Sequence, residues 1–188
     1  MTMTRTLVTG SLSSSAQPVL RTTGGLLLRP WEHTDVPVFL AAYRDADIRR
    51  WHTRRPCTEG QVRDWFDAYR QDWRDERGAH WAVTGDDGVL GRIALRGLNF
   101  DDGTADVAYW VLPAARRRGV ASQAVTALTG WALDEVGFCR LELDHSTRNE
   151  ASCRVATRCG YLLEGTKRSS ALHDDGRHDM HLHARIQE

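Results

Sequence analysis

The sequence has no excess of charge of either sign, because 25 lysines and arginines balance 25 aspartates and glutamates over 188 residues. A general nucleic-acid-binding protein normally carries a basic excess, so we expect no nucleic-acid partner. No apolar run is long enough to span a membrane, and the Ser- and Thr-rich start lacks the apolar segment of a signal peptide. We expect no membrane association, a disordered tail over residues 1–17 and one domain over residues 18–188.

Cysteine is scarce and lacks the C-x-x-C spacing of common metal sites. The four cysteines are Cys57, Cys139, Cys153 and Cys159. We interpret all four as reduced thiols in a cytoplasmic protein. His178, His181 and His183 lie close together, and the last two share one face of an expected strand. A metal site needs three or four converging ligands, and the sequence places no acidic or cysteine partner beside them, so we expect no metal.

The most informative segment runs from Tyr109 to Ser122. It predicts a buried strand that ends at Pro113, a basic loop with a glycine, and a helix that begins near Gly119. A loop that enters a helix presents unpaired backbone N–H groups and the positive end of the helix dipole. The segment therefore predicts a phosphate-binding site.

The remaining pattern predicts alternating strands and helices in one domain. Expected strands cover Leu26–Trp31, His80–Thr84, Val89–Leu98, Thr104–Leu112, Phe138–His145, Tyr161–Ala171 and His178–Ile186. Expected helices run from Thr34 or Asp35 to Ala46, from Glu59 to Arg77, from Gly119 to Val136, and from an Asn149 cap to Arg158. The segment Ile48–Trp51 is expected to lead into a loop.

Several of these segments resemble the GNAT superfamily of N-acetyltransferases. Arg116-x-x-Gly119-x-Ala121 is similar to the family's Arg/Gln-x-x-Gly-x-Gly/Ala loop, and further similar segments follow in the family's order. These are Leu28–Trp31, Asp106–Trp110, Asn149–Val155 and Cys159–Tyr161. The resemblance is closest to the branch of ribosomal-protein alanine N-acetyltransferases. It implies a single-domain α/β (α+β) fold with a mixed, mostly antiparallel sheet, helices on both faces, and a splay between the fourth and fifth expected strands.

The resemblance also implies acetyl-CoA as the co-substrate. The family's loop holds the pyrophosphate with backbone N–H groups, the strand before it pairs with the pantetheine arm, and the Asn and Ser of the later helix contact the arm near its sulfur. Carried onto this sequence, the cofactor-binding residues are Trp110, Val111, Leu112, Arg116, Arg117, Arg118, Gly119, Val120, Ala121, Ser122, Asn149 and Ser152. One of the three arginines is expected to be an ordinary surface charge.

Two residues are the candidate catalytic groups. Ser152 is the candidate proton donor to the leaving thiolate, directly or through water; alternatively, Asn149 and Ser152 only cap the helix. Asp106 is the candidate base, since it matches an acidic position in the family's strand, and the alternative is a solvent-facing polar residue. His145 is the second candidate, because its ordinary pKa suits proton transfer.

The expected function is transfer of an acetyl group to a primary amine by direct attack in a ternary complex. The acceptor is either a protein N-terminus or a small cationic amine such as an antibiotic. Five acidic residues would suit a cation, although their Asp-Asp-Gly pattern also suits turns: Asp101, Asp102, Asp106, Asp174 and Asp175. Trp51 or Trp65 is expected to line the acceptor cleft. The alternative is a CoA-binding sensor without turnover. Family members often dimerise, so a homodimer is expected.

Overall fold

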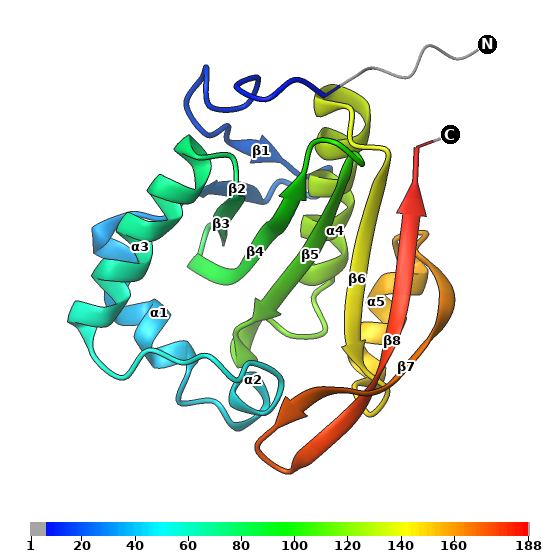
Figure 1. Cartoon of the computed structure of the whole chain (residues 1–188). Coiled ribbons are helices and arrows are strands. Elements are labelled where there is room, and N and C mark those ends of the chain that lie inside the picture. The colour runs from blue at the N-terminus through cyan, green and yellow to red at the C-terminus, as the bar shows by residue number, and fades with distance from the viewer. Residues whose placement is uncertain (1–6, 188) are drawn as a thin grey trace.

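The computed structural model describes residues 7–187, which form one mixed sheet covered by helices (Figure 1). The strands are β1 (Leu20–Arg21), β2 (Leu27–Pro30), β3 (Gly78–Gly85), β4 (Gly88–Asn99), β5 (Thr104–Val111), β6 (Arg140–Ser146), β7 (Leu162–His173) and β8 (Gly176–Ile186). Their order across the sheet is β1-β2-β3-β4-β5-β6-β8-β7. The β5–β6 pair is parallel, and the other neighbouring strands are antiparallel.

Helices cover both faces of the sheet, as expected. They are α1 (Val36–Ala42), α2 (Ala46–Trp51), α3 (Glu59–Arg74), α4 (Val120–Gly130) and α5 (Glu150–Arg158), with the short turns η1 (His33–Asp35) and η2 (Pro113–Ala115) and the π-helical η3 (Trp131–Val136). Gly137, with φ of 99°, ends the last of these. Within residues 7–187, no helix is both long enough and apolar enough to cross a bilayer.

Each face of the sheet has its own apolar core. On one face, α1 and α3 pack on β5 through an aromatic group in which Trp31, Phe39, Phe66 and Trp110 have ring centroids 4.9 to 6.2 Å apart. On the other face, α4 buries Val125 and Leu128 completely against the strands. Each such side chain contributes about 1.5–3 kcal/mol by leaving water. These two cores hold β5 from both faces. Whether its edge toward β6 is occupied depends on backbone pairing between the two strands.

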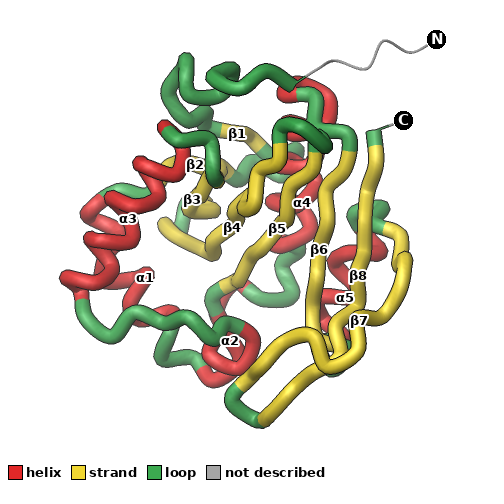
Figure 2. Tube along the Cα trace, in the orientation of Figure 1, coloured by secondary structure: helices red, strands yellow, loops and turns green. Residues whose placement is uncertain are grey.

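The strands β5 and β6 diverge soon after they meet. Only Thr104–Asp106 pair with Arg140–Glu142, and the pairing within the described residues stops there. Figure 2 shows the two strands separating toward the end of β5 that leads into α4. They are the fourth and fifth strands expected from the sequence, so the predicted splay is confirmed. The divergence leaves the second half of β5 with one unpaired edge.

The structure departs from the sequence expectations in two places. Part of the expected disordered tail, residues 7–17, packs on the domain: the Glu76 carboxylate accepts backbone N–H bonds from Leu12 at 2.7 Å and Ser13 at 2.9 Å, and Leu12 is buried. Residues 1–6 lie outside the described part. The segment expected to lead into a loop is instead α2, since Asp45 caps it by accepting the Ile48 N–H at 3.0 Å.

Candidate active site

A deep cleft opens where β5 and β6 diverge. Its volume is about 1260 Å³, more than most small-molecule pockets enclose. Its walls come from α2, the second half of β5, the loop into α4, the end of β6, α5 and the β7–β8 hairpin. Ten of the twelve predicted cofactor-binding residues line it: Trp110, Val111, Arg116, Arg117, Gly119, Val120, Ala121, Ser122, Asn149 and Ser152. Leu112 and Arg118 do not.

The start of α4 has no side-chain cap and lies at one end of the cleft. Gly119 adopts φ of 75°, a left-handed conformation that a residue with a side chain rarely takes, and no side chain caps the helix there. The first-turn N–H groups of Val120, Ala121 and Ser122 are therefore left for a ligand. The helix dipole adds positive potential at the same place, so this end of the cleft favours a phosphate.

The three loop arginines have different partners. Arg116 pairs with Asp47 at 2.9 Å and also with Asp45, so it joins the loop to α2. Arg118 pairs with Asp87 at 3.2 Å, outside the cleft lining. Arg117 has no ion pair within residues 7–187, lines the cleft and is exposed. Arg117 is therefore the loop arginine best placed to meet an anion.

The open edge of β5 presents backbone groups to the cleft. The Leu112 N–H donates to the Leu90 carbonyl at 2.9 Å, toward β4. Because successive residues of a strand direct their N–H groups to opposite edges, Tyr109 and Val111 face the open side. The His52 ring lies beside the backbone of Tyr109. Of the three residues expected to pair with a pantetheine arm, Val111 thus offers the available N–H group.

A pair of hydroxyl groups lies across the cleft from this edge. The Ser152 Oγ and the Tyr109 hydroxyl are 2.8 Å apart, and Ser152 is only 9% exposed. Burial raises the pKa of Tyr109 well above its ordinary value, so this hydroxyl stays protonated. Asn149 Oδ1 accepts the Ser152 backbone N–H at 3.1 Å, so Asn149 caps α5 as expected and also lines the cleft.

Comparison with known proteins identifies the family. Residues 25–162 match the family model of the acetyltransferase (GNAT) domain. The chain belongs to this acetyltransferase family. It is 22% identical to the uncharacterized N-acetyltransferase YoaA of Bacillus subtilis over 89% of this chain and 96% of the relative. It is 29% identical to the ribosomal-protein-serine acetyltransferase of Escherichia coli over 54% and 56% of the two chains.

Solved GNAT structures share the fold. RimL, a ribosomal L7/L12 alpha-N-protein acetyltransferase in complex with coenzyme A, superposes with a TM-score of 0.84 at 18% identity, over 90% of this chain and 98% of that one. The microcin C7 self-immunity acetyltransferase MccE, in complex with acetyl-CoA and AMP, gives 0.78 at 14% identity over 86% and 92%. The two neighbours are named for different acceptors, so the shared fold does not choose between them.

The opposite end of the GNAT cleft is built from α2 and the β7–β8 hairpin. Trp51 lines it from the end of α2, His52 from the position that follows, and His173 from the hairpin. Burial and the nearby guanidinium groups of Arg92 and Arg96 lower the pKa of His52 to about 4, which keeps its ring neutral. No motif in the sequence indicates a role for His52. Trp65, the other tryptophan expected here, packs against Phe39 and Tyr43 instead.

The acidic residues proposed for this acetyltransferase lie away from the lining. Asp106 is exposed on β5 beside β6; partial desolvation and the neighbouring Glu142 and Asp144 carboxylates raise its pKa, while Arg96 opposes the rise. It does not line the cleft, so its role as base stays a prediction. Asp174 and Asp175 are ion-paired with Arg55 and Arg148, and Asp101 and Asp102 form the β4–β5 turn.

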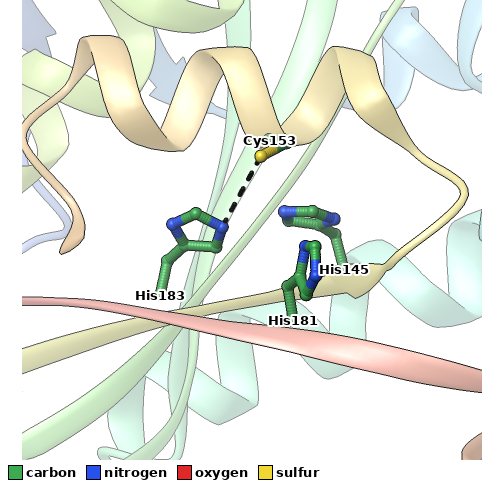
Figure 3. A group of neighbouring side chains, drawn as sticks. All are labelled: His145, Cys153, His181 and His183. Atoms are coloured by element: carbon green, nitrogen blue, oxygen red, sulfur yellow. Dashed lines mark hydrogen bonds between the residues drawn. The ribbon is translucent and has the colours of Figure 1, made fainter. Parts of the chain in front are cut away.

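The histidines near the end of the GNAT domain have a cysteine neighbour. The expectation that no cysteine joins them is wrong, because Cys153 Sγ lies 3.9 Å from His183 Nε2 (Figure 3). His145, the second candidate base, belongs to the same group. His178 does not, since its Nδ1 lies 2.8 Å from Ser146 Oγ and its Nε2 lies 2.8 Å from an Asp175 oxygen.

Proposed function

We propose that the chain transfers the acetyl group of acetyl-CoA to a primary amine by direct attack in a ternary complex. One juxtaposition carries the proposal: a single cleft contains the uncapped start of α4, the unpaired edge of β5 and the Ser152–Tyr109 hydroxyl pair. Acetyl-CoA has matching parts in a pyrophosphate, an amide-containing arm and a thioester. The coenzyme A complexes of the solved neighbours support the same choice.

Ser152, held by Tyr109, supplies the proton that the departing thiolate needs. Ser152 donates its hydroxyl proton to the departing thiolate while the Tyr109 hydroxyl, 2.8 Å away, holds the Ser152 oxygen in place. The proton that the amine loses on acylation returns to Ser152, so both hydroxyl groups end the reaction protonated. The Val111 N–H, on the open edge of β5, is the backbone donor placed to stabilise negative charge that develops on the carbonyl oxygen. His52, whose neutral ring lies beside the Tyr109 backbone, offers a ring nitrogen to orient the incoming amine.

The charges of the cleft favour a protein N-terminus as acceptor. Three acidic side chains line the cleft, and each has an ion-pair partner: Asp47 with Arg116, Asp144 with Lys167, and Glu150 with Arg154. Polyamines and cationic antibiotics carry several ammonium groups, which need unpaired carboxylates. A peptide presents one amine and an uncharged backbone. The names of the ribosomal-protein relatives support this acceptor.

The test is release of free thiol from acetyl-CoA with Ala- and Ser-starting peptides, a polyamine and a cationic antibiotic. We expect turnover with the peptides and about a hundredfold lower kcat in Ser152→Ala, with the Kd for acetyl-CoA unchanged. Tyr161→Phe is the matched control, because it removes one hydroxyl of another close pair, 2.7 Å from Thr129, that is buried outside the cleft lining. It should keep wild-type kcat.

Other outcomes decide between the remaining alternatives. Binding of acetyl-CoA without acceleration by any amine would make the chain a CoA-binding sensor instead. Turnover restricted to the polyamine or the antibiotic would overturn the peptide assignment. Asp106→Asn tests whether Asp106 acts as the base. A kcat within about twofold of wild type would show that Asp106 takes no part in the reaction. The expected homodimer stays a prediction, which the mass of the protein in solution tests.

A further inference from the structure

Four potential metal ligands converge between α5 and the sheet (Figure 3). His145 on β6 and His181 on β8 are direct cross-strand partners, and His183 lies two residues further along β8 on the same face. Cys153 of α5 points at this face. One ligand atom from each of the four residues lies within 4.8 Å of the others. The group brings three imidazoles and a thiol together from three separate elements.

Hydrogen bonds fix the ring nitrogens of two histidines in the form that binds metal. His145 Nδ1 lies 2.8 Å from the Ser146 carbonyl oxygen, and His183 Nδ1 lies 3.3 Å from the Tyr161 carbonyl oxygen. A carbonyl oxygen only accepts, so each Nδ1 carries the proton and each Nε2 keeps its lone pair. Carbonyl partners of this kind orient the histidine ligands of known metal sites.

The ring nitrogens of this group that could bind a metal have few other partners. Within the described residues, His145 Nε2 and His181 Nδ1 are buried and have no hydrogen-bond partner, and the His145 side chain is only 4% exposed. A buried polar atom without a partner costs about 1–3 kcal/mol. The rings of His145 and His183 are stacked with centroids 5.1 Å apart. Protonation would place two cations in contact there, whereas one metal ion would satisfy both rings.

We propose that His145, Cys153, His181 and His183 bind one divalent metal ion, with Zn²⁺ the best match. Tetrahedral Zn²⁺ with Zn–N near 2.0–2.1 Å and Zn–S near 2.3 Å sets its ligand atoms roughly 3.3 to 3.8 Å apart. The observed separations, 3.9 Å for the sulfur–nitrogen pair and at most 4.8 Å overall, come to that size with side-chain shifts of about 1 Å. Mg²⁺ and Ca²⁺ are disfavoured because no ligand is an oxygen.

Such an ion would tie α5 to the sheet at the edge of the cleft. Cys153 follows Ser152 directly in the sequence, and both it and His145 line the cleft. The metal would therefore restrict the movement of the helix that carries the proposed proton donor. It would do so without contacting the uncapped end of α4 or the open edge of β5, so metal binding and acetyl transfer can be measured separately.

Titration of the EDTA-treated protein with Co²⁺, in the absence of acetyl-CoA, tests the proposal. We expect one Co²⁺ per chain, with the visible bands of a tetrahedral site and a near-ultraviolet thiolate charge-transfer band, and displacement of both by Zn²⁺. Cys153→Ser should lose the charge-transfer band, and His181→Gln should weaken binding at least about tenfold. Cys139→Ser and His33→Gln, which alter a cysteine and a histidine outside the group, should match wild type.

Melting temperatures make the result independent of spectroscopy. Zn²⁺ should raise the melting temperature of the wild type and of both control variants, and should leave that of Cys153→Ser unchanged. Circular dichroism without metal confirms that each variant is folded. A folded wild type that shows no charge-transfer band, or equal metal affinity in the wild type, Cys153→Ser and His181→Gln, would overturn the site. Neither result would bear on acetyl transfer.

Discussion

The two sides of the cleft are built in different ways. The proposed cofactor side, residues 109–122 and 149–152, presents the uncapped start of α4 and the open edge of β5, which lie close together in the sequence. The proposed acceptor side, α2 and the β7–β8 hairpin, is held by side chains more than one hundred residues apart: Arg55 pairs with Asp174, and His173 Nδ1 bonds the Arg50 carbonyl at 3.0 Å. A binding site made of backbone groups is retained when most side chains change, whereas a few substitutions can alter a site that is held by side-chain contacts.

Two glycine substitutions, one on each side of the cleft, should change acetyl-CoA binding and the KM for the peptide separately. We expect their effects to be the largest. Gly119→Val places a branched side chain at φ of 75°, at the uncapped start of α4. The left-handed conformation costs roughly 1–2 kcal/mol, so we expect about tenfold weaker acetyl-CoA binding by calorimetry and an unchanged KM for the peptide.

Gly176→Val is the matched control for Gly119→Val. It strains the β7–β8 turn at φ of 113° and should raise the KM for the peptide while leaving acetyl-CoA binding intact. If both variants changed the same parameter, the two sides would not be independent.

Glu76 belongs to neither side of the cleft, so its substitution should change the stability of the protein without favouring either side. Burial acts to raise the pKa of Glu76, but the N–H donors of Gly10, Ser13 and Leu12 outweigh it, and the pKa lies below its ordinary value. Glu76→Gln should lower the free energy of unfolding by about 1 kcal/mol at neutral pH, measured in urea. Both KM values should stay as in the wild type at temperatures where the variant is folded.

The Glu76 effect has a defined pH dependence. A folded-state pKa below the unfolded value stabilises the protein fully above the unfolded pKa, and this contribution is lost as the pH falls through the folded pKa. The stability difference between wild type and Glu76→Gln should therefore be complete at pH 6 and shrink below about pH 4. A difference that grows in acid would contradict the role of the carboxylate.

The smallest effect is expected when the contacts between the α2 segment and the β7–β8 hairpin are weakened. Arg55 pairs with Asp174 and also donates to the carbonyls of Arg49 at 2.8 Å and His52 at 3.1 Å. Arg55→Ala should raise the KM for the peptide about two- to fivefold, because a partly exposed ion pair is worth at most about 1 kcal/mol. Arg63→Ala, which removes the exposed pair with Glu59 on α3, should change nothing.

The same contrast explains what the sequence could predict. The sequence could single out Gly119, Ala121, Asn149 and Ser152, which line the cleft, because a helix start and a helix cap need particular residues at short, fixed spacings. Tyr109 belongs to the motif before the loop, and its position two residues before Val111 predicts that both direct their backbone groups to one edge of the strand. These contacts depend on local geometry, which a sequence pattern records.

Contacts between distant segments left no such pattern. His52 follows a segment that the sequence predicts only to lead into a loop, and its approach to the Tyr109 backbone depends on how α2 is held by the hairpin. The sequence placed His181 and His183 on one face of a strand. It could not show that β8 aligns His181 with His145, or that α5 brings Cys153 over them. Register and helix packing are tertiary choices.

The short β5–β6 pairing also divides the sheet into two blocks, β1–β5 and β6–β8–β7, joined by three cross-strand residue pairs. Amide hydrogen exchange should therefore report two opening free energies, one for each block, rather than one for the whole sheet. A ligand that bridges the open edges would act as the missing ladder and slow exchange in both blocks at once. Opening of the sheet would then be most cooperative when the ligand is bound between the two blocks.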